Sequence, residues 1–174
     1  MTYYSRRDWK ARPPRARYKL REGDVDGIAL HWPAISSPLG NPDRVMSALR
    51  AWQNDHMDNP AKRWSDIAYQ VAIDQEGNTY RLRGLRHRSA ANGGTDVNLR
   101  FGAILLVVAG GEHPTMPLIE ATRKRIAVFR RYFPDANRIV GHRDIRPPEV
   151  GATACPGDRI HRLILAGAFD PNQR

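Results

Sequence analysis

The sequence predicts a single α/β domain in which helices pack against one central β-sheet. Short apolar segments typical of strands alternate along the chain with amphipathic segments typical of helices. One segment, 102–109, is almost continuously apolar, as expected of a central strand covered on both faces. The 174 residues, 41% of them hydrophobic, suffice to bury one core, and no linker or repeat divides them. We therefore expect one domain at 24–174, with a basic N-terminal arm at 1–23 packed on it.

The first elements follow from apolar segments and capping residues. Residues 3–23 are rich in arginine and lysine and contain prolines, so we expect an irregular arm. The apolar residues 28–30 predict a buried strand that ends at His31. Asn41-Pro42 has the chemistry of a helix start, and apolar residues then recur every three or four positions, which predicts a helix over about 42–57.

The rest of the chain continues this alternation. Residues 69–74 and 79–82 are separated by turn residues and predict a hairpin. After the apolar strand, a hydrophobic stripe begins at Pro117 and has basic residues on its opposite face, which predicts an amphipathic helix to about 133. The expected order ends with a short strand at 138–141, a loop rich in proline and glycine at 142–157 and a helix at 158–167.

The charge of the chain favours anionic partners. The formal net charge is +10, which attracts nucleic acid, acidic membranes and anionic cell-wall polymers. The basic residues are spread over the arm, 81–88 and 123–131, without a common nucleic-acid-binding motif, so we expect no specific nucleic-acid partner. The longest apolar segment is far shorter than the roughly 20 residues that span a bilayer, so no membrane span is expected. The first thirty residues contain no apolar segment typical of signal peptides.

Three residues at the ends of predicted elements form a candidate metal site. His31 and His142 each follow a strand, and Cys155, the single cysteine, lies in the loop after the second strand. Two imidazoles and one thiolate are ligands that Zn²⁺ accepts, and three protein ligands leave one tetrahedral position for water. Because the three are distant in sequence, the pattern also fits residues packed separately in a core.

Several strings occur in a characteristic order along the chain. The most specific are GHRD at 141–144 and TACPGD at 153–158. They are preceded by SRRDWKA at 5–11, IALHW at 28–32, WSDIAY at 64–69 and IDQEG at 73–77. Together, over roughly 5–165, they resemble the type 2 N-acetylmuramoyl-L-alanine amidases, whose fold is shared by phage endolysins and peptidoglycan recognition proteins.

The resemblance implies a mixed central sheet with helices on both sides and a zinc ion in a surface cleft. His31, His142 and Cys155 match the family's zinc ligands. Zinc there activates a water that attacks the amide between the lactyl group of N-acetylmuramic acid and L-alanine. A thiolate bound to the metal is not free to attack substrate, so Cys155 is not expected to be a nucleophile.

The same resemblance implies roles for other residues. Tyr69 matches a tyrosine that faces the metal, where its protonated hydroxyl orients the water or hydrogen bonds to the developing oxyanion. Thr153 matches a position that is Lys or Thr in the family, and it either donates to the tetrahedral intermediate or makes a local turn bond. Trp32, next to the first ligand, is the best candidate for stacking on a sugar.

Two departures from the family pattern affect the site. Some members have a glutamate on the strand that matches 103–108, where this chain is apolar, so the general base is Tyr69, the activated water itself or another residue. The usual Trp-His-Ala-Gly string for substrate binding is absent. His87 and Asn92, in the segment where that string belongs, are candidate substrate contacts.

We therefore expect a monomeric, zinc-dependent amidase that acts on peptidoglycan, most simply the catalytic domain of a phage endolysin. Such a protein stays in the host cytoplasm until its release to the wall, where anionic polymers attract it. A bacterial autolysin or recycling amidase is the alternative origin. The competing functions are a non-hydrolytic peptidoglycan-binding protein of the same fold, which the three retained ligands disfavour, and a basic nucleic-acid-binding protein.

Overall fold

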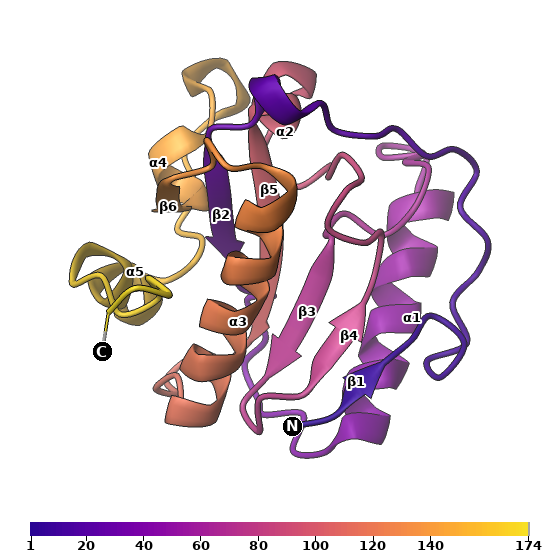
Figure 1. The fold of residues 1–174 in the computed structure, drawn as a ribbon. Helices are drawn as coiled ribbons and strands as arrows, with labels where there is room; N and C mark the ends of the chain where they lie inside the picture. Colours follow the sequence, from indigo (N-terminus) through magenta and orange to yellow (C-terminus); the bar gives the residue numbers. More distant parts are fainter. Residues whose placement is uncertain (174) are drawn as a thin grey trace.

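The computed structural model describes residues 1–173 and consists of one six-stranded sheet with helices on both faces (Figure 1). The strands are β1 (Tyr3–Tyr4), β2 (Gly27–His31), β3 (Val71–Asp74), β4 (Thr79–Arg81), β5 (Phe101–Val107) and β6 (Arg138–Gly141). The α-helices are α1 (Pro42–Asp58), α2 (Thr95–Arg100), α3 (Met116–Tyr132), α4 (His142–Ile145) and α5 (Asp158–Leu165). Short 3₁₀ turns lie at Glu22–Asp24 and Pro148–Val150. No helix within residues 1–173 is long and apolar enough to cross a membrane.

The sheet is mixed, which confirms the predicted fold class. Its strand order is β1-β4-β3-β5-β2-β6, and only β3 and β4 pair antiparallel. The parallel register places Leu30 of β2 opposite Gly141 of β6. The next residues along these strands are His31 and His142, so the register brings the two histidines to the same edge of the sheet.

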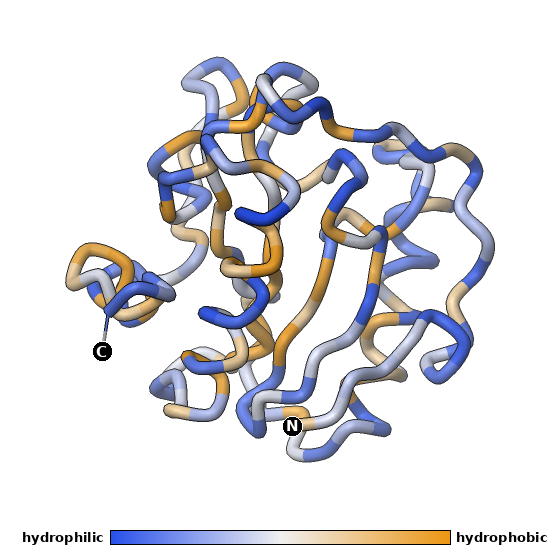
Figure 2. Tube along the Cα trace, viewed as in Figure 1, coloured by the Kyte–Doolittle hydropathy of each residue, from blue (hydrophilic) through white to orange (hydrophobic). Residues whose placement is uncertain are grey.

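Two hydrophobic clusters lie on opposite faces of the sheet. On one face α3 and α5 cover Ile28, Leu30, Ile104 and Leu106, with Phe129 of α3 fully buried. On the other face α1 covers the β3–β4 half of the sheet through Val45 and Leu49. Figure 2 shows the hydrophobic residues concentrated along the central strands and on the helix faces turned toward them. The part of the second face over β2 is not covered by α1, and the candidate metal site lies there.

Most predicted elements are present, with four differences. The predicted loop 142–157 begins with the short helix α4, whose N-terminus is capped by the Asp144 carboxylate, which accepts a hydrogen bond from Gly141 N at 2.7 Å. Helix α2 was not predicted, because six residues are too few to establish an apolar period. Strand β1 was not predicted in the arm, and the hairpin strand begins at Val71 rather than at residue 69.

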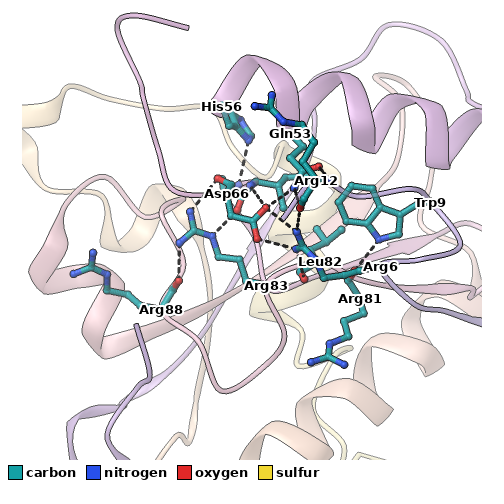
Figure 3. A network of polar contacts seen from close by, with 12 residues as sticks. Arg6, Trp9, Arg12, Gln53, His56, Asp66, Arg81, Leu82, Arg83 and Arg88 are labelled. Carbon is teal, nitrogen blue, oxygen red and sulfur yellow. Dashed lines mark hydrogen bonds and ion pairs between the residues drawn. The ribbon is translucent and has the colours of Figure 1, made fainter. Parts of the chain in front are cut away.

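The N-terminal arm is fixed to the domain by a buried polar network (Figure 3). At its centre Asp66, which is 3% exposed, forms an ion pair of 2.8 Å with Arg6 of the arm. The Asp66 carboxylate also accepts a hydrogen bond of 2.6 Å from Gln53 of α1. Beside this network the Trp9 indole N–H donates to Arg81 O at 2.8 Å, and its ring is fully buried. The network therefore fixes the segment just before Tyr69 against both α1 and the arm.

Replacing Asp66 by alanine should lower the free energy of unfolding by about 3 kcal/mol, because the Arg6 guanidinium then stays buried without its partner. Urea unfolding of the metal-free protein measures the effect. Asp58→Ala is a matched control: Asp58 also pairs with arginines, but it is 51% exposed and should cost less than about 1 kcal/mol. Equal losses in the two variants would mean that the Asp66 network adds no more than a surface ion pair.

Candidate metal centre

Three potential metal ligands converge beside the end of β2. His31 is the last residue of β2, His142 the first of α4, and Cys155 lies in the loop before α5. Their ligand atoms all lie within 4.8 Å of one another, and Cys155 Sγ is 3.6 Å from His31 Nδ1. Both histidines are buried, at 1% and 7% exposure. The structure thus brings together the three residues that the sequence analysis predicted as metal ligands.

Asn92 fixes the orientation and tautomer of His31. Its amide nitrogen donates to Phe101 O at 2.9 Å, which identifies the other amide atom as the oxygen. That oxygen lies 2.9 Å from His31 Nε2, so Nε2 must carry the hydrogen. The lone pair of His31 is then on Nδ1, the atom that faces Cys155. Metal-binding histidines are commonly held by such a bond to the second ring nitrogen.

A buried polar cluster supports Asn92 in turn. The backbone N–H of Asn92 donates to Asn98 Oδ1 at 3.0 Å, and Ser89 Oγ donates to the same oxygen at 2.8 Å. Asn98 belongs to α2, so this helix holds the 89–94 segment against the sheet. Asn92, Ser89 and Asn98 are all buried.

The protonation states of the three residues suit a cation. Burial and, to a smaller extent, the nearby His142 lower the pKa of His31 to about 3. Burial and the Arg146 guanidinium lower the pKa of His142 to about 4, so both imidazoles are neutral at pH 7. Burial raises the pKa of the Cys155 thiol to about 11, against the effect of a backbone hydrogen bond from Trp32. Binding of a metal would therefore release one proton, from Cys155.

Tyr69 lies beside the centre. Its ring meets that of His31 edge-on, with centroids 5.3 Å apart. Burial, with the nearby Cys155 as a smaller cause, raises the pKa of Tyr69, so its hydroxyl stays protonated and can donate. The ring of His56 from α1 lies 6.3 Å from that of Tyr69, and Trp64 lies next to His56. The sequence analysis did not assign His56 to this neighbourhood.

Thr153 and Trp32, two further predicted site residues, contact the loop that carries Cys155. The Thr153 hydroxyl accepts a hydrogen bond of 3.2 Å from Cys155 N, which is the local turn bond of the two roles considered. The half-buried Trp32 ring packs against Gly157, where the φ of +86° favours glycine and an added Cβ would lie only 3.2 Å from the ring. Trp32 lines a pocket of about 220 Å³ together with Pro156 and Ile160.

Two predicted substrate contacts lie elsewhere. Asn92 is 0% exposed and bound to His31, so it cannot reach a substrate in this conformation and has a supporting position instead. His87 lines a pocket with residues of α3, on the opposite face of the sheet from the centre. The Asp144 carboxylate, two residues after His142, accepts a hydrogen bond from Gly141 N and lies 2.8 Å from His161 Nε2.

Arg146 is a neighbour of the centre that the sequence did not indicate. Its Nη1 lies 3.4 Å from His142 Nε2, and its other nitrogens donate to the carbonyls of Val150 and Gly151. It borders a polar pocket of about 480 Å³ beside the centre. The pocket is lined by residues from Trp64, the 88–98 segment and the loop after α4: Trp64, Arg88, Ser89, Ala90, Ala91, Gly93, Gly94, Thr95, Asn98, Arg146 and Val150.

Replacing Asn92 by alanine should weaken Zn²⁺ binding by about 10- to 100-fold, because the His31 ring loses its fixed tautomer and orientation. Competition with a chromophoric chelator measures the affinity. In Asn92→Asp a carboxylate can still accept from Nε2–H, so this variant should retain affinity to within a few-fold. Equal losses in the two variants would contradict the orienting role.

The fold and the donor set define a class, an α/β domain with two histidines and one cysteine placed as candidate metal ligands beside a polar pocket. Residues 21–158 match the family model described as N-acetylmuramoyl-L-alanine amidase. The chain therefore belongs to the N-acetylmuramoyl-L-alanine amidase family.

Known relatives share the fold. The chain is 27% identical over 166 residues to Drosophila melanogaster peptidoglycan-recognition protein LB, covering 92% of this chain and 66% of that protein. It is 24% identical over 168 residues to mouse peptidoglycan recognition protein 1, covering 91% and 84% of the two chains. A variant of the Drosophila protein in complex with tracheal cytotoxin superposes with a TM-score of 0.80 at 25% identity, covering 97% of this chain and 95% of that one.

Proposed function

We propose that this protein is a Zn²⁺-dependent amidase that cleaves the bond between N-acetylmuramic acid and L-alanine in peptidoglycan. The observation that carries the proposal is the convergence of His31, His142 and Cys155 within 4.8 Å, in a chain of the amidase family. A protein that only bound peptidoglycan would have no use for a complete ligand set beside a protonated tyrosine. The convergence therefore favours hydrolysis over recognition alone.

The donor set fits zinc. Two neutral imidazoles and a thiol that can lose its proton match the borderline-soft character of Zn²⁺, and hard cations such as Mg²⁺ prefer oxygen ligands. When bound, zinc would supply a Lewis acid that polarises the substrate carbonyl and lowers the pKa of water.

The side chains around the centre would orient the metal ligands and stabilise the negative charge that develops on the substrate. Asn92 holds His31 in the ligating tautomer, at 2.9 Å. Tyr69 donates its hydroxyl proton as a hydrogen bond to the oxygen on which negative charge develops. The Thr153 hydroxyl accepts a hydrogen bond from Cys155 N, and its own hydrogen can be donated to the same oxygen or within the loop. Cys155 serves as a ligand and not as a nucleophile.

The polar pocket beside the centre would hold the stem peptide. Arg88 and Arg146 line it and would pair with the peptide carboxylates, and Trp64 supplies an apolar wall. The complex of the Drosophila relative with tracheal cytotoxin, a monomeric diaminopimelic acid-type peptidoglycan, supports a peptidoglycan fragment as the ligand. Trp32 remains the candidate for a sugar contact, on the other side of Cys155.

We further propose that the protein acts as a monomer and as the catalytic domain of a phage endolysin, held in the host cytoplasm until its release to the wall. The net charge of +10 supports attraction to anionic wall polymers. A bacterial autolysin or recycling enzyme would use the same chemistry.

Mass spectrometry of purified peptidoglycan after digestion tests the reaction. The zinc-loaded protein should release stem peptides with a free amino terminus on L-alanine, and Cys155→Ala should release none. New reducing sugars or cut cross-links would identify a different hydrolase. Tight binding of soluble muropeptides with no cleavage by the zinc-loaded protein would identify a recognition protein.

A further inference from the structure

A second pocket lies on the sheet face opposite the metal centre. It has a volume of about 330 Å³ and lies between α3, the edge strand β1, its neighbour β4 and the loop 84–87. In Figure 1, α3 covers this face of the sheet. The pocket is lined by Tyr3, Val71, Arg81, Gly84, Leu85, Arg86, His87, Arg125, Val128 and Tyr132.

The charge of this pocket is uncompensated. Arg81, Arg86 and Arg125 line it and no acidic residue does. Within residues 1–173 none of these three arginines forms an ion pair with a carboxylate. Arg17 and Lys19 lie nearby, since they and Arg81 add to burial in lowering the pKa of His87. Cations that gather around a hollow without counter-charges attract an anion.

Two of the three arginines lie over aromatic rings, which restricts their side chains. The Arg86 guanidinium lies 5.3 Å from the ring centroid of Tyr132, and that of Arg125 lies 5.9 Å from the ring of Tyr3. Figure 3 shows the Arg81 side chain pointing away from the Asp66 network, although its carbonyl accepts from Trp9. Cations held in this way lose less side-chain freedom when they bind a ligand.

Two buried polar atoms at the pocket have no hydrogen-bond partner in the described part of the chain. They are Arg125 Nε and His87 Nδ1. A buried polar atom without a partner is costly, and a ligand that accepts or donates there removes the cost. The point where a Cβ on Gly84 would sit is 3.5 Å from Arg81 Nε and 3.7 Å from His87 Nδ1, so these two groups also converge.

We propose that this pocket binds phosphate groups of an anionic polyol-phosphate polymer of the cell wall. Guanidinium groups bind phosphate through paired N–H donors, and three arginines line this pocket. The choice of a wall polymer rests on the proposed function, because peptidoglycan is the layer in which the protein would act. Single-stranded nucleic acid is the competing ligand, because Tyr3 and Tyr132 are 53% and 43% exposed and each has a guanidinium over one face only, so the test below includes an oligodeoxynucleotide.

The position of the pocket has a consequence for catalysis on intact walls. Because it lies on the face opposite the metal centre, polymer and stem peptide can be bound at once. Two contacts to one cell wall raise the effective concentration of the second. The pocket would therefore strengthen attack on whole walls and leave cleavage of a small soluble fragment unchanged.

Binding of polyglycerol phosphate to the full chain, measured by calorimetry at 0.15 M salt, tests the proposal. The double variant Arg86→Gln/Arg125→Gln should bind at least about tenfold more weakly than the unaltered protein. The double variant Arg44→Gln/Arg162→Gln is the matched control, because it loses the same charge at exposed positions outside the pocket and should change affinity less than about threefold.

Three results would overturn the proposal: no measurable binding by the unaltered protein, equal losses in the two double variants, or tighter binding of an oligodeoxynucleotide of equal charge. The last result would identify a nucleic-acid site. Cleavage of a soluble muropeptide is measured on the same samples. If binding follows the prediction and cleavage is absent, the amidase proposal fails and the phosphate site stands. If the protein cleaves the muropeptide but does not bind the polymer as predicted, the phosphate site fails and the amidase proposal stands.

Discussion

Cys155→Ala should lower kcat/KM for muropeptide cleavage by at least about three orders of magnitude, because losing the metal removes several kcal/mol of transition-state stabilisation. The thiol is 3.6 Å from His31 Nδ1 and completes the donor set. Without it two neutral imidazoles remain, and these alone hold Zn²⁺ weakly. Metal content after gel filtration, measured by atomic emission, should fall together with activity.

The variant needs a control for folding. Cys155 is only partly buried, so alanine there should change the free energy of unfolding of the metal-free protein by less than about 1 kcal/mol. Added Zn²⁺ should raise the melting temperature of the unaltered protein and leave that of Cys155→Ala nearly unchanged. Full activity of the variant with normal metal content would remove Cys155 from the ligand set.

The three candidate metal ligands could be predicted from the sequence, but the residues that hold them in place could not. His31 ends β2 and His142 directly follows β6, and these strands pair in parallel; the strings around both histidines and around Cys155 are specific enough to identify a family. Asn92 is different, because it lies 61 residues from His31 in the chain and is placed against it by bonds to Asn98 of α2 and Phe101 of β5. It was predicted as a substrate contact because its segment occupies the place of a binding string that this chain lacks.

The same reasoning applies to the fold. Elements with a long apolar period, such as α1 and α3, could be predicted closely, because hydrophobic burial alone specifies them. The short elements β1, α2 and α4 depend on tertiary contacts. Thus β1 forms because Tyr3 and Tyr4 can pair with β4, and α4 because Asp144 caps it. The cationic pocket is a further case, since its arginines belong to β4, a loop and α3 and meet only in the folded chain.

Tyr69→Phe should lower kcat by about 10²- to 10³-fold, the effect typical of removing one donor to a developing oxyanion. The ring of Tyr69 meets that of His31 edge-on at 5.3 Å, and phenylalanine would keep this packing. Because burial raises the pKa of Tyr69, the hydroxyl acts as a donor across the neutral pH range, so the kcat ratio should not change between pH 6 and 9. Affinity for Zn²⁺ should stay within about twofold, since Tyr69 is not a ligand.

Tyr80→Phe is the control that distinguishes an effect of a lost tyrosine hydroxyl on catalysis from an effect on stability. The Tyr80 hydroxyl donates to Asp74 at 2.8 Å in the core beneath α1, and neither residue lines the pocket proposed for the stem peptide. Tyr80→Phe should therefore lower the free energy of unfolding by about 1 kcal/mol and leave kcat unchanged. A donor that acts only on the transition state changes kcat and kcat/KM equally. If Tyr69→Phe instead raised KM and left kcat constant, the Tyr69 hydroxyl would bind the substrate in its ground state, and the proposed role would be wrong.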